Sequence, residues 1–359
     1  VVACHNPSYV DKYNMVQELV DGGTFLLNCP WDMEGLEKHL PGQVKAYIAN
    51  HNIKFYTIDG IKIGKEIGLG GRINTVLQSA FFKLAEIIPE EEAISLMKAA
   101  AKATYGRKGD KIVQMNYDAI DAGAKQVVEI EVPESWKDAA DEGLAVPHID
   151  ENGRKDVIDF VKNIQTKVNA QEGNSLPVSA FTDYADGSTP SGSSAYEKRG
   201  IAVDIPIWQP DNCIQCNRCA YVCPHAVIRP VALTEEEAAN APEGMQSIPM
   251  IGMPDMKFAI TVSAYDCTGC GSCANVCPGK KGEKALVMGN MEENAGKQTF
   301  FDYGREIPVK PEVVAKYKET TVKGSQFKQP LLEFSGACAG CGETCLLYTS
   351  DAADERSSV

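Results

Sequence analysis

One cysteine pattern occurs twice in this 359-residue chain, as CIQCNRCAYVCPH from Cys213 and as CTGCGSCANVCPG from Cys267. Each copy reads Cys-x2-Cys-x2-Cys-x3-Cys-Pro. A [4Fe–4S] cube needs one thiolate for each iron, and two-residue gaps let three successive thiolates surround one cube. The fourth cysteine lies too far along the chain to complete the same cube comfortably, and in two-cluster ferredoxins it binds the other cluster.

The repeat therefore predicts two adjacent cubes that exchange their last ligands, and two such cubes form a short path for electrons. The predicted first set is Cys213, Cys216, Cys219 and Cys277, and the second set is Cys267, Cys270, Cys273 and Cys223. Zinc is the alternative, because zinc also binds four cysteines. Zinc sites, however, usually contain two separated Cys-x2-Cys pairs rather than three evenly spaced cysteines followed by Cys-Pro.

The other cysteines form a third group and two isolated positions. Cys338 and Cys341, in SGACAGCGET, supply half of a further site, and Cys345 follows four residues later. Cys4 and Cys29 are expected to be buried like small hydrophobic residues. Tight Cys-x2-Cys groups in a long acidic chain favour metal ligation in a reducing cytoplasm over a disulfide framework.

The composition excludes some classes of partner. The net charge of −14 argues against nucleic acid or an anionic membrane as the main partner. No apolar run approaches the roughly 20 residues of a membrane span. The chain begins with Val1 instead of Met, which suggests an internal segment of a longer polypeptide.

Residues 1–133 alternate between strand and helix patterns, which predicts crossover units on a mostly parallel sheet. The predicted strands are 22–31, 54–59 and 126–132, and the predicted helices are 33–51 with a break at Pro41, 73–88 and 89–106. The glycine-rich stretch 62–73 follows the second strand. Gly70, Gly71 and Arg72 there could contact a phosphate before a helix, although a tight turn with a solvated arginine is the alternative.

Several segments together resemble the pyruvate:ferredoxin (flavodoxin) oxidoreductases. They are GGTFLLNCPW, IGLGGRIN, SAYEKRGIAVDIPIWQPDNCIQCNRCAYVCPHAVIRP and KGSQFKQPLLEFSGACAGCGET, and YEKRG (196–200) resembles the signature of the family's small EKR domain. The resemblance runs from residue 1 to Thr344.

The resemblance implies a homodimeric enzyme with thiamine diphosphate, Mg and three [4Fe–4S] clusters. This family converts pyruvate and coenzyme A to acetyl-CoA and CO2 and passes the electrons to ferredoxin or flavodoxin. It further implies that Cys338 and Cys341 are ligands of the third cluster, nearest the thiamine, and that Gly70, Gly71 and Arg72 could contact coenzyme A. It assigns no catalytic residue to this segment, which alone is expected not to turn over pyruvate.

The resulting fold class is multidomain. The expected series is an α/β gamma-type domain at 1–133, a connector at 134–164, a small irregular EKR domain at 165–209, an α+β two-cluster ferredoxin-like domain at 210–290, a connector at 291–322, the start of the thiamine domain at 323–345, and an unassigned tail at 346–359 that could be non-native.

Three alternatives to this function stay open: an oxidoreductase for another 2-oxoacid, a polyferredoxin-like electron carrier, and a zinc-bound interaction protein. A further hypothesis concerns Lys280, Lys281 and Lys284, which could dock an acidic electron carrier. A solvated basic run is the alternative interpretation of these lysines.

Overall fold

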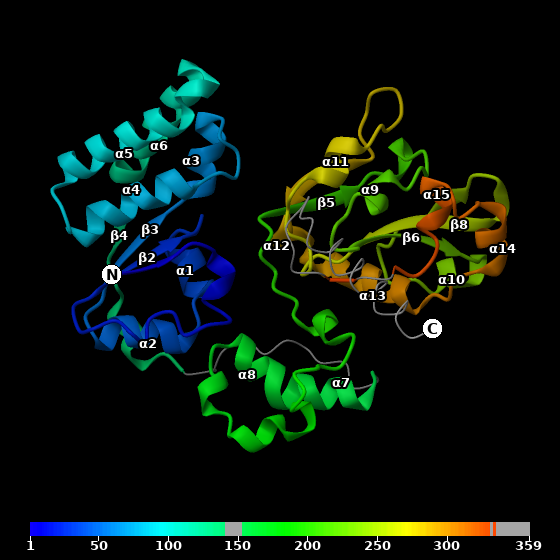
Figure 1. Ribbon diagram of the computed structural model, residues 1–359, viewed down its shortest axis with the longest axis horizontal. Helices are drawn as coiled ribbons and strands as arrows, with labels where there is room; N and C mark the ends of the chain where they lie inside the picture. The colour runs from blue at the N-terminus through cyan, green and yellow to red at the C-terminus, as the bar shows by residue number, and fades with distance from the viewer. Residues whose placement is uncertain (141–152, 331–332, 335–359) are drawn as a thin grey trace. The chain divides into compact units, whose positions relative to one another are not determined.

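The computed structural model describes residues 1–140, 153–330 and 333–334. The chain divides into two compact units, Val1–Val146 and Pro147–Val359 (Figure 1). Cys338, Cys341, Cys345 and the tail 346–359 lie outside the described residues. Among the helices of the described residues, none has both the length and the apolar character needed to cross a bilayer.

The first unit is built on a four-stranded sheet in the order β1-β2-β3-β4. Its strands are β1 (Val2–Cys4), β2 (Thr24–Asn28), β3 (Lys54–Ile58) and β4 (Val128–Ile130). The pairs β1–β2 and β2–β3 are parallel, and β4 runs antiparallel to β3. The predicted mostly parallel sheet is confirmed.

Side chains alternate along β2 because successive residues of a strand point to opposite faces. Phe25 and Leu27 pack in one core with Leu36 and Val44, whereas Leu26 packs in a second core with residues of the later helices. The sheet is therefore covered on both faces, which explains why β2 is a continuous hydrophobic run.

The described residues of the first unit also form the α-helices α1 (Met33–His39), α2 (Gly42–Asn50), α3 (Gly60–Ile67), α4 (Asn74–Ala85), α5 (Glu90–Tyr105) and α6 (Asp110–Lys125). The break at Pro41 is confirmed. The glycine-rich stretch 62–73 begins inside α3, which was not predicted and which ends at Ile67 with Gly68 as its C-cap at a φ of +93°. Helix α6 was not predicted.

The described part of the second unit starts with a helical segment, which consists of α7 (Lys155–Phe160), a π-helical turn (Val161–Gln165) and α8 (Thr166–Asn169). Val157, Phe160, Val161 and Ile164 form its small core. Short turns then lead through Tyr196 to the EKR signature.

The described residues after the signature contain two small antiparallel sheets. Strand β5 (Asp204–Trp208) pairs with β9 (Leu286–Asn290). The other sheet has the order β6-β8-β7 and contains β6 (Ile228–Leu233), β7 (Ile248–Met250) and β8 (Met253–Val262). This second sheet is built from the chain between the two cysteine motifs.

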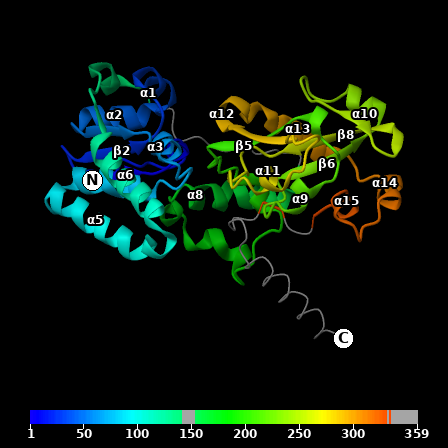
Figure 2. The same ribbon diagram turned by 90° about the horizontal axis from the view of Figure 1, so that it is seen from above.

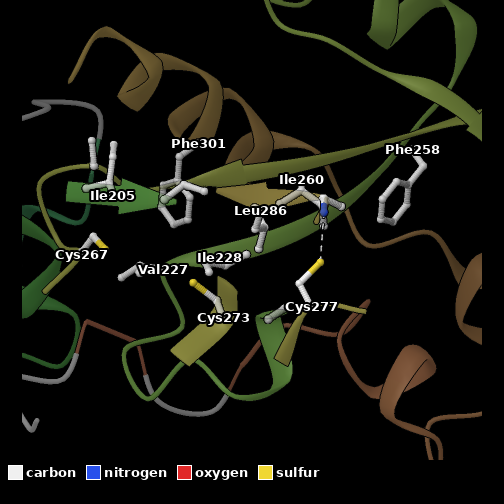
Figure 3. Packing of buried hydrophobic residues seen from close by; sticks show 14 of the residues in the cluster. Ile205, Val227, Ile228, Phe258, Ile260, Cys267, Cys273, Cys277, Leu286 and Phe301 are labelled. Carbon is white, nitrogen blue, oxygen red and sulfur yellow. Dashed lines mark hydrogen bonds between the residues drawn. The ribbon is translucent and has the colours of Figure 1, made fainter. Parts of the chain in front are cut away.

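Short helices connect and cover these sheets: α9 (Arg218–Tyr221), α10 (Glu235–Ala239), α11 (Ser272–Val276), α12 (Met291–Asn294), α13 (Gln298–Glu306), α14 (Pro311–Lys316) and α15 (Val322–Ser325). Helices α9 and α11, which belong to the two cysteine motifs, lie side by side (Figures 1 and 2). Phe258, Leu286 and Phe301 share one hydrophobic core with Cys267, Cys273 and Cys277 (Figure 3).

Candidate metal centre

The two cysteine motifs have the same backbone conformation at matching positions. In the first motif Gln215 and Asn217 have φ angles of +54° and +58°, and in the second motif Gly269 and Gly271 have φ angles of +70° and +74°. Glycine adopts this left-handed region without steric cost. The first motif therefore needs compensating contacts for its two larger residues.

Side-chain hydrogen bonds hold the first motif in this conformation. Gln215 Nε2 donates to Pro249 O at 2.8 Å, and Ile251 N–H donates to Gln215 Oε1 at 2.8 Å. Asn217 Nδ2 donates to Lys323 O at 2.9 Å. Neither residue was predicted from the sequence, although an alignment of the two motifs places Gln215 and Asn217 opposite glycines and marks both positions.

The structure brings the predicted first set together. Cys213 lies close enough to Cys216 and Cys277 for their charges to interact, and Cys219 is similarly close to Cys213 and Cys216. All four cysteines line one cavity, whose other walls include Phe258, Ile260 and Leu286. The fourth cysteine of the second motif thus stands with the first three cysteines of the first motif.

The predicted second set gathers in the reciprocal way. The charges of Cys267 and Cys273 each interact with those of Cys223 and Cys270, and Cys223 interacts with Cys270. Cys219 also interacts with Cys273, so the two sets adjoin.

Backbone amides point at the sulfur atoms. Gln215 N–H donates to Cys213 Sγ and Gly269 N–H donates to Cys267 Sγ, both at 3.4 Å. Ala285 N–H donates to Cys277 Sγ at 3.3 Å (Figure 3). Such hydrogen bonds stabilise charge on sulfur and adjust the reduction potential of a bound cluster.

Burial opposes ionisation of the thiols in the protein without metal. It raises the pKa values of Cys213, Cys219 and Cys223. It also raises the pKa of Cys267 to about 11 and that of Cys273 to about 12. Because the thiolate is the ligand, metal binding must release these protons.

The donor set fits iron–sulfur chemistry. Each set offers four soft sulfur ligands, and all of them except the exposed Cys270 are buried or half-buried, which suits clusters bound through thiolates. In the described part of the chain, no group of three or more His, Cys, Asp or Glu side chains is arranged to hold a single metal ion, whereas a [4Fe–4S] cube takes one thiolate on each of its four irons.

The residues predicted to contact a phosphate and the two isolated cysteines lie in the first unit. Gly70, Gly71 and Arg72 lie in the exposed turn between α3 and α4 of the first unit. Cys4 and Cys29 are 2% and 4% exposed in the core, as expected.

Two of the three candidate docking lysines donate hydrogen bonds to backbone carbonyls of other residues. Lys284 Nζ donates to Ala274 O at 2.9 Å and to Asn275 O at 2.8 Å, near the end of α11. Lys280 Nζ donates to Asp211 O at 3.1 Å. These contacts give both lysines a structural role beside the cysteine sets.

Three family models match the chain in order. Residues 1–126 match the family described as pyruvate ferredoxin/flavodoxin oxidoreductase. Residues 148–202 match the EKR domain, described as a domain of unknown function. Residues 212–281 match a 4Fe-4S dicluster domain.

Curated relatives align with 96% of the chain. A pyruvate:ferredoxin oxidoreductase from Moorella thermoacetica is 49% identical over 347 residues, and a pyruvate-flavodoxin oxidoreductase from Enterobacter agglomerans is 48% identical over 343 residues. A pyruvate dehydrogenase [NADP(+)] from Cryptosporidium parvum is 44% identical over 367 residues. The chain spans 28% of the length of the first two and 18% of the third. In the order of its domains and in its identity over nearly the whole chain, the protein is similar to one segment of the pyruvate:ferredoxin/flavodoxin oxidoreductases.

Proposed function

We propose that this chain is the electron-transfer segment of an enzyme that oxidatively decarboxylates pyruvate with coenzyme A to acetyl-CoA and CO2. The observation that carries the proposal is the exchange of Cys223 and Cys277 between the two adjoining cysteine sets. The names of the relatives support pyruvate as the substrate. A single cluster would not need the second motif.

Each cysteine set would hold one [4Fe–4S] cluster. When bound, such a cluster accepts and releases single electrons. The chain's own residues would supply the rest: thiolates as ligands, amides that hydrogen-bond to sulfur, and a core that includes Phe258 and Leu286 and keeps water away from the site.

The described residues also support an order for the two sets. Phe334 N–H donates to His225 O at 2.9 Å, and His225 follows Cys223 of the second set by two residues. Cys338 follows Phe334 by four residues in the sequence, and a stretch of that length spans at most about 14 Å. We therefore place the second set between the third cysteine pair and the first set.

The remaining cofactors and partners belong to the whole enzyme. Cys338 and Cys341 would be ligands of a third cluster, and thiamine diphosphate with Mg would bind largely outside this chain. Coenzyme A is proposed to contact Gly70, Gly71 and Arg72, and the whole enzyme is proposed to be a homodimer. The abundance of clustered cysteines supports a reducing cytoplasm.

Ferredoxin or flavodoxin is the proposed electron acceptor, since the relatives at 49% and 48% identity carry these names. The Cryptosporidium relative, which is named for NADP(+), supports NADP(+) as a second candidate. Reduction assays with each acceptor in the enzyme that contains this chain would separate the two.

Anaerobic reconstitution with iron and sulfide tests the cluster proposal. A brown protein with about eight iron atoms for the two described sets is expected. A colourless protein that takes up zinc instead would overturn it. Cys4→Ala, which removes a buried thiol of the first unit, is the control and should keep the iron content.

Paired substitutions test the exchange of ligands. Cys277→Ser together with Cys219→Ser removes two ligands of one proposed set, so about four iron atoms should remain. Cys277→Ser together with Cys273→Ser removes one ligand from each set and should lose both clusters. The reverse pattern of iron contents would show that each motif binds its own cluster.

A further inference from the structure

We propose that Lys198, in the EKR signature, is a positioning residue for the second cysteine set and sets the reduction potential of its cluster. In this role the Lys198 ammonium neutralises the buried Asp266 carboxylate beside Cys267. The proposal rests on the proposed function, because it requires a cluster at this set. It also assigns a task to a domain whose matching family is described as having unknown function.

The EKR signature has an unusual backbone. Lys198 has a φ of +41° and Gly200 has a φ of +59°. A long side chain in this region is uncommon and persists when surrounding contacts hold it. One such contact is the Gly200 N–H, which donates to Tyr265 O at 2.7 Å. The turn therefore binds the segment directly before the second cysteine motif.

The Lys198 side chain completes this attachment. Its ammonium forms an ion pair with Asp266, whose side chain is only 5% exposed. The Ser263 hydroxyl donates to the same Asp266 oxygen at 2.5 Å. The Lys198 ammonium also lies 4.7 Å from the centre of the Phe334 ring. Lys198 thus occupies a defined position between the second motif and Phe334.

The chain after the signature covers the second motif. A Cβ atom placed on Gly269 would lie 3.0 Å from Asp204 O and 3.3 Å from Ala202 Cβ. Ala202 is 8% exposed and shares the core with Cys267. The chain directly after the EKR signature, here called the EKR segment (residues 201–204), therefore packs on the loop that holds Cys267 and Cys270.

The expected effect follows from the charges. The negative charge of Asp266 interacts electrostatically with the Cys267 thiolate. A reduced cluster carries one more negative charge than an oxidised one. Removal of Lys198 leaves a buried carboxylate without compensation beside the second set. This change disfavours the reduced state there and affects the first set less, because the interaction weakens with distance.

The test is a redox titration of the cluster-loaded protein, monitored by EPR, with Lys198→Met. The potential of the second cluster should become more negative by about 59 mV, which is a tenfold change in the ratio of reduced to oxidised cluster. The first cluster should shift much less. Lys198→Arg keeps the charge and should restore the native potential. Arg199→Gln removes a neighbouring positive charge that is 41% exposed, and it should change neither potential.

Two further variants complete the design. Lys323→Met assigns the signals, since the Lys323 charge interacts with Cys213 and Cys216 of the first set. The double variant Lys198→Met with Asp266→Asn removes both charges and should return the second potential towards the native value. If Lys198→Met loses about four iron atoms, recovery of the iron in the double variant supports the same ion pair.

Three outcomes would overturn the proposal: unchanged potentials in Lys198→Met, equal shifts of both clusters, or a double variant that does not recover. If the native protein binds iron but the variants give one of these results, the proposed function stands and only this inference fails. If the native protein binds no iron, both the proposed function and this inference fail.

Discussion

At the scale of single residues, the left-handed positions in the two cysteine motifs have been filled in different ways. The second motif uses Gly269 and Gly271, whereas the first uses the buried residues Gln215 and Asn217 and holds them with side-chain hydrogen bonds. The two glycines differ in their surroundings. A Cβ on Gly269 meets Asp204 O at 3.0 Å, and a Cβ on Gly271 meets nothing within 4 Å.

Substituting alanine at each glycine should separate backbone strain from crowding. Gly271→Ala should cost about 1–2 kcal/mol, since only the left-handed conformation is strained. Gly269→Ala should cost about 1–3 kcal/mol more, because the chain at Asp204 must also move. Thermal unfolding of the two variants measures the difference. Equal losses would contradict the close packing of the EKR segment on this loop.

The buried thiols of the first unit should resist alkylation. Burial raises the pKa of Cys4 and of Cys29 to about 12. The ionised fraction of each thiol at pH 8 is then about one in ten thousand, and the thiolate is the reactive form. Brief treatment with iodoacetamide and mass spectrometry should show both unmodified, and both should react after unfolding in guanidinium. Rapid modification in the native protein would refute their burial.

At the scale of secondary-structure elements, the sequence predicted those features that depend on neighbouring residues and not those that depend on contacts with distant parts of the chain. The break at Pro41 and the mostly parallel sheet follow from local chemistry, and both are found. Helix α3 was not predicted, because the glycines of 62–73 suggested a phosphate contact or a tight turn. Gly64 instead allows close packing, since a Cβ there would lie 2.5 Å from Gly70 O. The cysteine spacing predicted which side chains gather, whereas the contacts of Gln215 depend on the distant Pro249.

Helix α10 offers a test of an element held by its cap. Thr234 and Glu237 form a capping box, and Glu237 pairs with Lys310, whose side chain is 9% exposed, at 2.7 Å. Glu237→Gln leaves this lysine without its charge partner and should cost about 1–3 kcal/mol. Glu236→Gln, in the same helical turn but exposed, is the matched control. Thermal unfolding should show a lower midpoint for the first variant only.

The pH dependence of this contribution has a defined sign. Partial burial alone would raise the pKa of Glu237, but the hydrogen bonds from Lys310 and Thr234 outweigh it and lower the pKa below the ordinary value of 4.5. A lowered pKa in the folded state means that the stabilisation is present above pH 4.5 and is lost as the pH falls further. The difference between native and Glu237→Gln midpoints should therefore shrink in acid, and a difference that grows would contradict this assignment.

At the scale of the whole molecule, the net charge of −14 opposes approach of an acidic electron carrier. Productive docking then needs a local basic surface. All three candidate lysines are exposed, but they differ in their contacts. The ammonium groups of Lys280 and Lys284 donate to backbone carbonyls and so have a structural role. If a carrier docks beside these sets, Lys281 is the residue whose charge can act mainly on association.

Charge reversal at Lys281 tests this division of roles. Lys281→Glu should slow reduction of an acidic carrier at low ionic strength, and added salt should diminish the effect because it screens exposed charges. Lys284→Gln should instead lower the cluster content at any salt concentration, since its ammonium holds Ala274 O and Asn275 O beside Cys273 and Cys277. Lys318→Glu, at an exposed lysine outside both motifs in the sequence, controls for the change in net charge. Equal slowing by Lys281→Glu and Lys318→Glu would place the effect in the overall charge and remove the case for docking at this surface.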